Sequence, residues 1–69
     1  MGKKLCYLTR GDEAVITRIK KAPRLQTLGL APGVVVCCKY KSDRVMVLEI
    51  GDRLVALPVF QLRRVWADY

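Results

Sequence analysis

The sequence of 69 residues predicts a small all-β fold, a partly open antiparallel barrel of five short strands with one short helix. Three observations favour this class. Short runs rich in β-branched residues alternate between apolar and polar positions, as half-buried strands do. Tight-turn residues separate these runs. Helical spacing of apolar residues is clear in one segment alone, residues 25–33, and no internal repeat or second domain appears.

The helix is predicted to begin at Pro23, whose ring fixes φ and whose missing N–H would be unpaired in a first turn. Leu25 and Leu28 lie three positions apart and share a helical face. Gly29 ends the helix because it adopts positive φ without a Cβ penalty, and Leu30 folds back onto Leu25 in a Schellman-type stop.

Pro32 and Gly33 then form a turn, since proline suits the first corner position and glycine the positive φ of the second. This turn directs the chain into the next strand. Turn and core geometry explain the whole segment, so we interpret its motif residues as structural rather than ligand-binding: Leu25, Leu28, Gly29, Leu30, Pro32 and Gly33.

The first strand, residues 14–19, follows a polar turn at residues 10–13. Ala14 and Ile16 are expected to face the core. Ile19 is out of phase with them, so its burial requires a bulge near Arg18.

In the second strand, Lys39 and Lys41 are expected to face water. Alternation then turns Cys37 outward with Val35, and places four residues on the core side: Val34, Val36, Cys38 and Tyr40.

A hairpin turn at residues 41–44 leads to a third strand, residues 45–50, with Met46, Leu48 and Ile50 inward and Val45 and Val47 outward. The remaining elements are a turn at 51–53, a short strand at 54–57 ended by Pro58, one helical turn at 59–64 and a last strand at 65–69.

Thirteen Lys and Arg against six Asp and Glu give a net charge of +7. The bases are spread along the chain, so either a solvated surface or a nucleic-acid face is compatible with them, and we favour the former. No apolar run approaches the roughly 20 residues of a membrane span, and the first residues lack the features of an export signal. The expected compartment is the cytoplasm.

Chemistry-bearing residues are sparse. With three cysteines and no histidine, and with Cys37 and Cys38 on opposite faces of a strand, we expect no metal site. No phosphate-cradling glycine-rich loop and no carboxylate pair suited to acid–base work is present. We therefore expect no enzymatic activity, no cofactor and no small-molecule substrate.

The run Leu28-Gly29-Leu30-Ala31-Pro32-Gly33, with Val36-x-Cys38, residues 54–57 and Leu62…Val65, resembles the FeoA family, ferrous-iron transport protein A. The resemblance covers residues 8–69 and implies one SH3-like barrel domain over residues 1–69. It also implies a cytoplasmic accessory role beside FeoB, the GTPase-containing membrane permease for Fe²⁺. The same type of domain occurs at the C-terminus of iron-dependent repressors.

Two other functions compete with docking on a permease. One is binding of RNA or single-stranded nucleic acid, for which the aromatic residues offer stacking surfaces: Tyr7, Tyr40, Phe60, Trp66 and Tyr69. Against it, Tyr40 is expected in the core and the aromatics are not interleaved with the basic pairs, so we expect no nucleic-acid partner. The other is a regulatory or oligomerising module unconnected with iron.

The candidate docking residues are Val47, Phe60 and Trp66. If Leu62 and Val65 fill the core, Trp66 points outward, and tryptophan is enriched at interface hot spots. These three residues would contact the cytoplasmic domain of a permease or a second copy of the chain. The alternative is that Trp66 merely covers the open end of the barrel.

Overall fold

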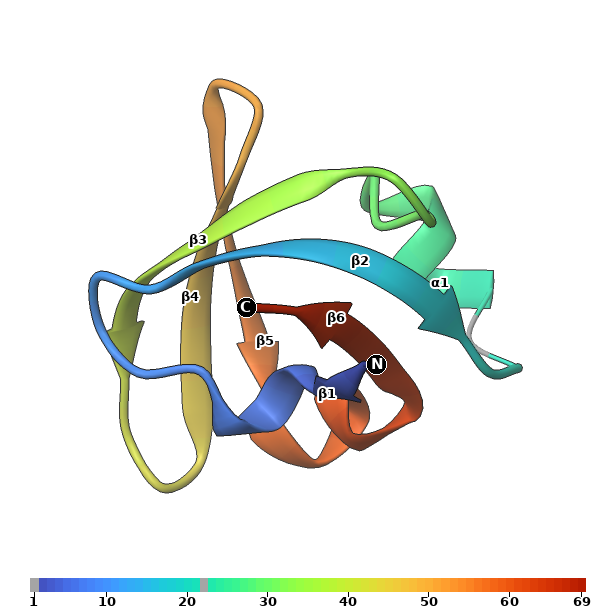
Figure 1. Ribbon diagram of the computed structural model, residues 1–69. Coiled ribbons are helices and arrows are strands. Elements are labelled where there is room, and N and C mark those ends of the chain that lie inside the picture. The colour runs from blue at the N-terminus through green and yellow to red at the C-terminus, as the bar shows by residue number, and fades with distance from the viewer. Residues whose placement is uncertain (1, 22) are drawn as a thin grey trace.

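The computed structural model describes residues 2–21 and 23–69. Over these residues the chain forms a single antiparallel sheet of six strands in the order β1-β6-β2-β3-β4-β5, strongly curled but unclosed (Figure 1). The strands are β1 Lys3–Lys4, β2 Glu13–Ile19, β3 Val35–Lys41, β4 Val45–Ile50, β5 Arg53–Pro58 and β6 Val65–Asp68. The helical segments are η1 Leu5–Tyr7, α1 Pro23–Thr27 and η2 Val59–Arg64, of which η1 and η2 are 3₁₀ helices. The predicted fold class is confirmed.

The predicted number of strands is wrong by one. Lys3 and Lys4 pair with Ala67 and Trp66 of β6, which makes β1 an edge strand of the sheet. Two lysines carry no strand signal of their own. They are extended because they pair with β6, at the other end of the chain.

The segment of residues 25–33 has the predicted geometry. The N–H of Leu30 donates to the carbonyl of Leu25 at 3.0 Å, and the N–H of Gly29 donates to that of Gln26 at 3.0 Å. These are the two hydrogen bonds of a Schellman motif. Gly29 has φ of +101°, and Leu25 and Leu30 are both buried, as the stop requires.

The turn at Pro32 and Gly33 is confirmed as well. The N–H of Val34 donates to the carbonyl of Ala31 at 3.1 Å, and Gly33 has φ of +92°, which together define a type II turn. The turn also joins β2, since Gly33 donates to the carbonyl of Ile16 at 2.7 Å and Ile16 donates to that of Val34 at 2.9 Å. The segment is thus fixed to the sheet by backbone hydrogen bonds.

A bulge in β2 was predicted from the phase of Ile19, and it is present. The register of β2 against β6 shifts between Ile16 and Arg18, after which Arg18 pairs with Trp66 and Ile19 with Val65. Ala14 and Ile16 are buried, and Ile19 packs partly buried against the core. The bulge therefore lets residues of opposite phase face the same interior.

A second bulge, in β3, overturns part of the predicted alternation. The register of β3 against β4 shifts between Cys38 and Tyr40. Tyr40 is consequently exposed, with 53% of its surface accessible, and Lys41 turns inward, where its ammonium donates to the carbonyl of Cys6 at 2.7 Å. The predictions that Tyr40 faces the core and Lys41 faces water are wrong because the extra residue inverts the phase of the strand end.

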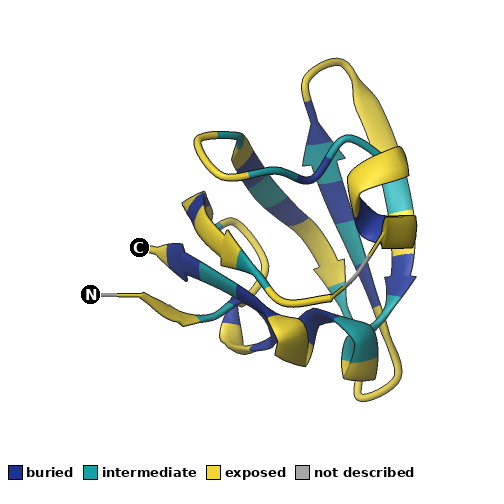
Figure 2. Ribbon diagram, turned by 90° about the vertical axis from the view of Figure 1, so that its right-hand side faces the viewer, coloured by how far each residue is buried: buried dark blue, intermediate teal, exposed yellow. Residues whose placement is uncertain are grey.

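The rest of the strand assignments hold. Met46, Leu48 and Ile50 are buried, and Figure 2 shows buried and more exposed positions alternating along the strands. Val36 and Cys38 are buried, whereas Cys37 is half-buried. Of the lead-in at residues 5–8, the core takes Leu5, Cys6 and Leu8.

The polar turn before β2 is organised by Asp12. Its carboxylate accepts hydrogen bonds from the backbone N–H of Thr9 at 3.0 Å and from the Thr9 hydroxyl at 2.8 Å. These two bonds, the backbone one first, hold the pKa of Asp12 below its ordinary value. The predicted turn chemistry of this segment is confirmed.

Candidate partner-binding groove

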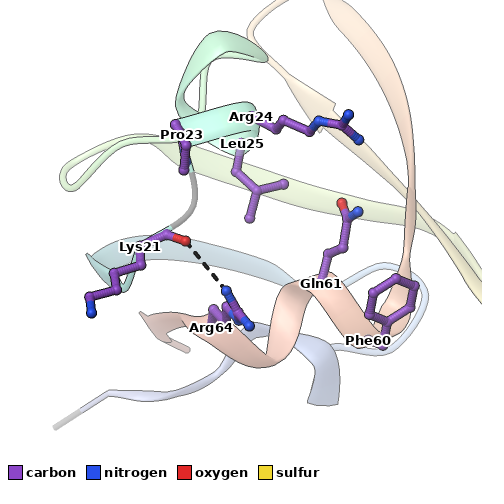
Figure 3. A pocket seen from close by; sticks show the side chains of 7 residues that line it. All are labelled: Lys21, Pro23, Arg24, Leu25, Phe60, Gln61 and Arg64. Atoms are coloured by element: carbon purple, nitrogen blue, oxygen red, sulfur yellow. Dashed lines mark hydrogen bonds between the residues drawn. The ribbon is translucent and has the colours of Figure 1, made fainter.

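An open pocket of about 430 Å³ lies between α1 and η2. Figure 3 shows Leu25 directed from α1 toward η2, with Phe60 at one end. Leu25 is only 2% exposed, whereas Phe60 is 68% exposed. The pocket therefore combines an apolar base with an accessible aromatic ring, and is lined by Lys21, Pro23, Arg24, Leu25, Phe60, Gln61 and Arg64.

Hydrogen bonds across the chain hold the two walls together. The guanidinium of Arg64 donates to the carbonyl of Lys21 at 3.4 Å, and the N–H of Lys20 donates to the carbonyl of Arg64 at 2.9 Å (Figure 3 shows the first). At the far end of α1, the guanidinium of Arg53 donates to the carbonyl of Leu28 at 3.0 Å. Both ends of the helical segment are thus joined to later parts of the sequence.

A second pocket, of about 440 Å³, adjoins the first and shares Lys21 and Arg64 with it. Among the residues that the structure describes, five of the six that line it are basic: Lys4, Lys20, Lys21, Arg63 and Arg64, with Trp66 as the sixth. We call the two pockets together the basic groove.

The basic groove holds nearly all of the excess positive charge of the domain. Six of the thirteen Lys and Arg line it, and none of the six Asp and Glu does. The seven bases and six acids elsewhere almost cancel, as in the pair of Lys39 and Glu49, whose charged atoms lie 3.5 Å apart. A concave surface lined by charges of one sign concentrates the field and attracts anionic partners.

Trp66 stands half-buried on β6, between Lys4 of β1 and Arg18 of β2. The flanking residues Val65 and Ala67 are buried, so Trp66 is on the outer face of the sheet, as expected. The guanidinium of Arg18 lies over the indole at 4.8 Å from the ring centroid, a cation–π contact that covers part of the ring.

Of the three predicted docking residues, the structure places two on the adjoining pockets. Phe60 lines the first pocket and Trp66 the second. Val47 lines neither; it is half-buried on β4, paired with Tyr40 of β3 and Ala56 of β5, and two strands separate β4 from β6 in the sheet.

Sequence reasoning missed the convergence of the bases. The pairs Lys20-Lys21 and Arg63-Arg64 were visible in the sequence, but nothing local shows that they meet. The pairing of β2 with β6 places Lys20-Lys21, after β2, beside Arg63-Arg64, before β6, and no local pattern in the sequence encodes that pairing.

The two features that count against a nucleic-acid partner in the sequence differ in the structure. Tyr40 is exposed rather than buried. Aromatic and basic side chains that are separate in the sequence are adjacent in space, since Lys3 lies over the ring of Tyr69 at 5.1 Å and Arg18 over that of Trp66. In both pairs, however, the protein's own cation occupies a ring face that a base would need for stacking.

Metal-ligating side chains do not gather in the described part of the chain, where no three His, Cys, Asp or Glu residues are placed to share an ion. Cys6 and Cys38 are buried, and burial raises the pKa of the Cys38 thiol above its ordinary value. Within residues 2–21 and 23–69, none of the helices has the length and apolar character needed to cross a bilayer.

The FeoA domain model matches residues 3–67. A solved iron uptake regulatory protein (FeoA) is 19% identical, with a TM-score of 0.90 over 97% of this chain and 96% of the other. A manganese-dependent transcriptional repressor (15% identity, TM-score 0.86, 96% of this chain and 40% of the repressor) and IdeR of T. acidophilum (18%, 0.85, 96% and 33%) contain the same fold within longer chains. A search of curated proteins gave no match.

Proposed function

The chain belongs to the FeoA domain family of small SH3-like proteins associated with ferrous iron transport, and from this premise we propose that it docks on and modulates an FeoB-type GTPase permease. In this role it is a non-enzymatic cytoplasmic accessory protein. The contact is the permease's cytoplasmic GTPase domain, and the docking surface is the basic groove with Phe60 and Trp66.

The observation that carries the proposal is the exposure of Phe60 at the end of an apolar-based groove. Leu62, two residues further along η2, is completely buried, whereas Phe60 is 68% exposed. A partner that covers the exposed ring of Phe60 would remove its apolar surface from water, which favours binding. Large aromatic side chains beside a concave surface are typical of binding hot spots.

The test is a binding measurement between this chain and the purified cytoplasmic domain of the permease. Phe60→Ser and Trp66→Ser are expected to weaken docking by about 2 kcal/mol or more each, in the hot-spot range. Leu54→Ser is the matched control, because Leu54 is 65% exposed on β5 and lines neither pocket. It should leave affinity unchanged, and Phe60→Ser should leave the melting temperature close to that of the wild type.

Equal affinity of Phe60→Ser, Trp66→Ser and wild type would place docking elsewhere on the domain. Sedimentation of the chain alone, with the same variants, distinguishes self-association through this surface from docking on a permease. Micromolar or tighter binding of mixed-sequence RNA at physiological salt, falling steeply as salt is added, would favour the nucleic-acid alternative instead.

A further inference from the structure

We propose that the basic groove receives an acidic protein segment in which one large apolar side chain enters the pocket beside Leu25 and Phe60 and a run of carboxylates follows along Lys20, Lys21 and Arg63. The inference rests on the proposed docking function in one respect, that the ligand is a protein. It adds the chemistry of the segment that the groove recognises.

The acidic character follows from the charges of the groove. The second pocket presents five cations and no carboxylate, and none of the acidic residues of the chain lines either pocket. Arg63 and Lys20 are exposed, and no hydrogen bond or ion pair of their side chains is observed among the described residues. Their charges are therefore available to a partner, and complementary charges across an interface set both specificity and association rate.

The apolar anchor follows from the first pocket. Its base is Leu25, its end is Phe60, and Pro23 adds a further apolar surface. A volume of about 430 Å³ accommodates a large side chain, and an apolar group placed there removes the exposed ring of Phe60 from water. Because the two pockets share Lys21 and Arg64, the anchor and the carboxylates belong to one continuous segment.

A membrane of anionic lipids fits these observations less well. Polybasic surfaces do bind such membranes. The apolar element here, however, is the base of a groove between α1 and η2, and Leu25 at that base is 2% exposed. A bilayer surface would contact the rim and Phe60 while leaving the pocket unfilled.

Single-stranded nucleic acid also fits less well. It binds proteins through phosphates and through bases stacked on aromatic faces. The aromatic residue among the cations of the second pocket is Trp66, and its ring already carries the guanidinium of Arg18 at 4.8 Å. An acidic peptide needs no stacking platform in that pocket.

The test uses three synthetic peptides and amide chemical shifts of the labelled chain. The first peptide has one phenylalanine followed by a run of glutamates; the second replaces the phenylalanine with serine; the third replaces the glutamates with glutamines. We expect the first peptide to shift the amides of Lys20, Lys21, Arg24, Leu25 and residues 60–66, and each of the others to bind at least about fivefold more weakly.

Charge-reversal variants provide the matched control. Arg63→Glu should weaken binding of the first peptide at least about fivefold. Arg44→Glu changes the net charge equally, but Arg44 lies in the β3–β4 hairpin and lines neither pocket, so its effect should stay below about twofold. Arg64 is unsuitable for this test because its side chain holds the carbonyl of Lys21.

Equal binding of the three peptides, or equal weakening by Arg63→Glu and Arg44→Glu, would overturn the inference. So would phosphatidylglycerol vesicles or oligouridylate binding at the groove without displacement by the first peptide. Measurements with the permease domain separate the two proposals. If permease docking needs Phe60 but tolerates Arg63→Glu, the proposed function stands and this inference is overturned. If the first peptide binds the groove but the permease domain does not dock, this inference stands and the proposed function is overturned.

Discussion

The segment of residues 25–33 and the basic groove share Leu25 but are constructed in opposite ways. The segment is closed by hydrogen bonds between residues a few positions apart, such as that from Leu30 to Leu25. The groove is assembled from residues 4, 20–21, 23–25, 60–61, 63–64 and 66, which only the sheet topology brings together. Local sequence therefore determines the turn, while the fold determines the binding surface.

The two regions also differ in what they do for stability. The segment buries apolar side chains and satisfies its backbone hydrogen bonds, which both stabilise the domain. The groove gathers six positive charges without a carboxylate, an arrangement whose self-repulsion disfavours the folded state. Such a cost is expected of a surface kept for binding.

The largest expected effect tests the local region. Gly29→Val should lower the free energy of unfolding by roughly 1–3 kcal/mol, because a β-branched residue is strained at φ of +101°. The nearest atoms to an added Cβ, on Arg53 and Ile50, are at 3.5 and 3.6 Å, so the Cβ itself fits and the backbone strain remains. Urea denaturation measures it, with Gln26→Ala of α1 as the nearly neutral control. An unchanged midpoint for Gly29→Val would contradict the Schellman stop.

The next prediction tests the alternation of inward and outward residues in β3, the strand that follows the turn at Pro32 and Gly33. Cys38 is fully buried with a raised pKa, whereas Cys37 is half-buried, so a thiol reagent should modify Cys37 at least about tenfold faster. The measurement is mass spectrometry of a native Cys6→Ala variant after timed labelling. Equal rates at the two cysteines would mean that the alternation of β3 is not as described.

A smaller effect tests contacts that depend on topology. Arg18→Ala removes the cation above Trp66 and should cost about 0.5–1 kcal/mol of unfolding free energy. Arg44→Ala, in the β3–β4 hairpin, serves as the control and should stay within about 0.5 kcal/mol of wild type. Thermal denaturation measures the stability of both variants. Equal losses of stability in Arg18→Ala and Arg44→Ala would contradict the cation–π contact.

The smallest predicted effect concerns the repulsion within the groove. Arg63→Glu should raise the free energy of unfolding by about a few tenths of a kcal/mol, since it replaces one of six clustered positive charges with a negative one. Added salt should remove this gain, because it screens exposed charges. A destabilised Arg63→Glu at low salt would show that Arg63 has a structural role.

These regions also mark how much could be predicted from the sequence. The helix stop, the turn and the β2 bulge each left a local signal, in Gly29, Pro32-Gly33 and the phase of Ile19. The β3 bulge did not. Lys39, Tyr40 and Lys41 continue a regular polar alternation, and the inward lysine finds an acceptor for its ammonium in the carbonyl of Cys6, from η1.

The candidate site was predicted only in part, because local sequence shows which residues face outward but not which of them share a surface. Phe60 and Trp66 were identified as apolar residues that the core does not use, and the structure brings them to adjoining pockets. Val47 satisfies the same criterion and lies elsewhere, because outward orientation says nothing about which part of the outer surface a residue joins. The surrounding bases required the pairing of β6 with β1 and β2, which no local pattern encodes.

The central claim, that the basic groove is the docking surface, is tested most directly by adding the unlabelled cytoplasmic domain of the permease to the isotope-labelled chain and following amide signals. We predict that the signals lost or shifted belong to Lys20, Lys21, Arg24, Leu25, residues 60–64 and Trp66, and that those of the β3–β4 hairpin and β5 persist. Changes confined to the hairpin and β5, with the groove signals unaltered, would contradict the claim.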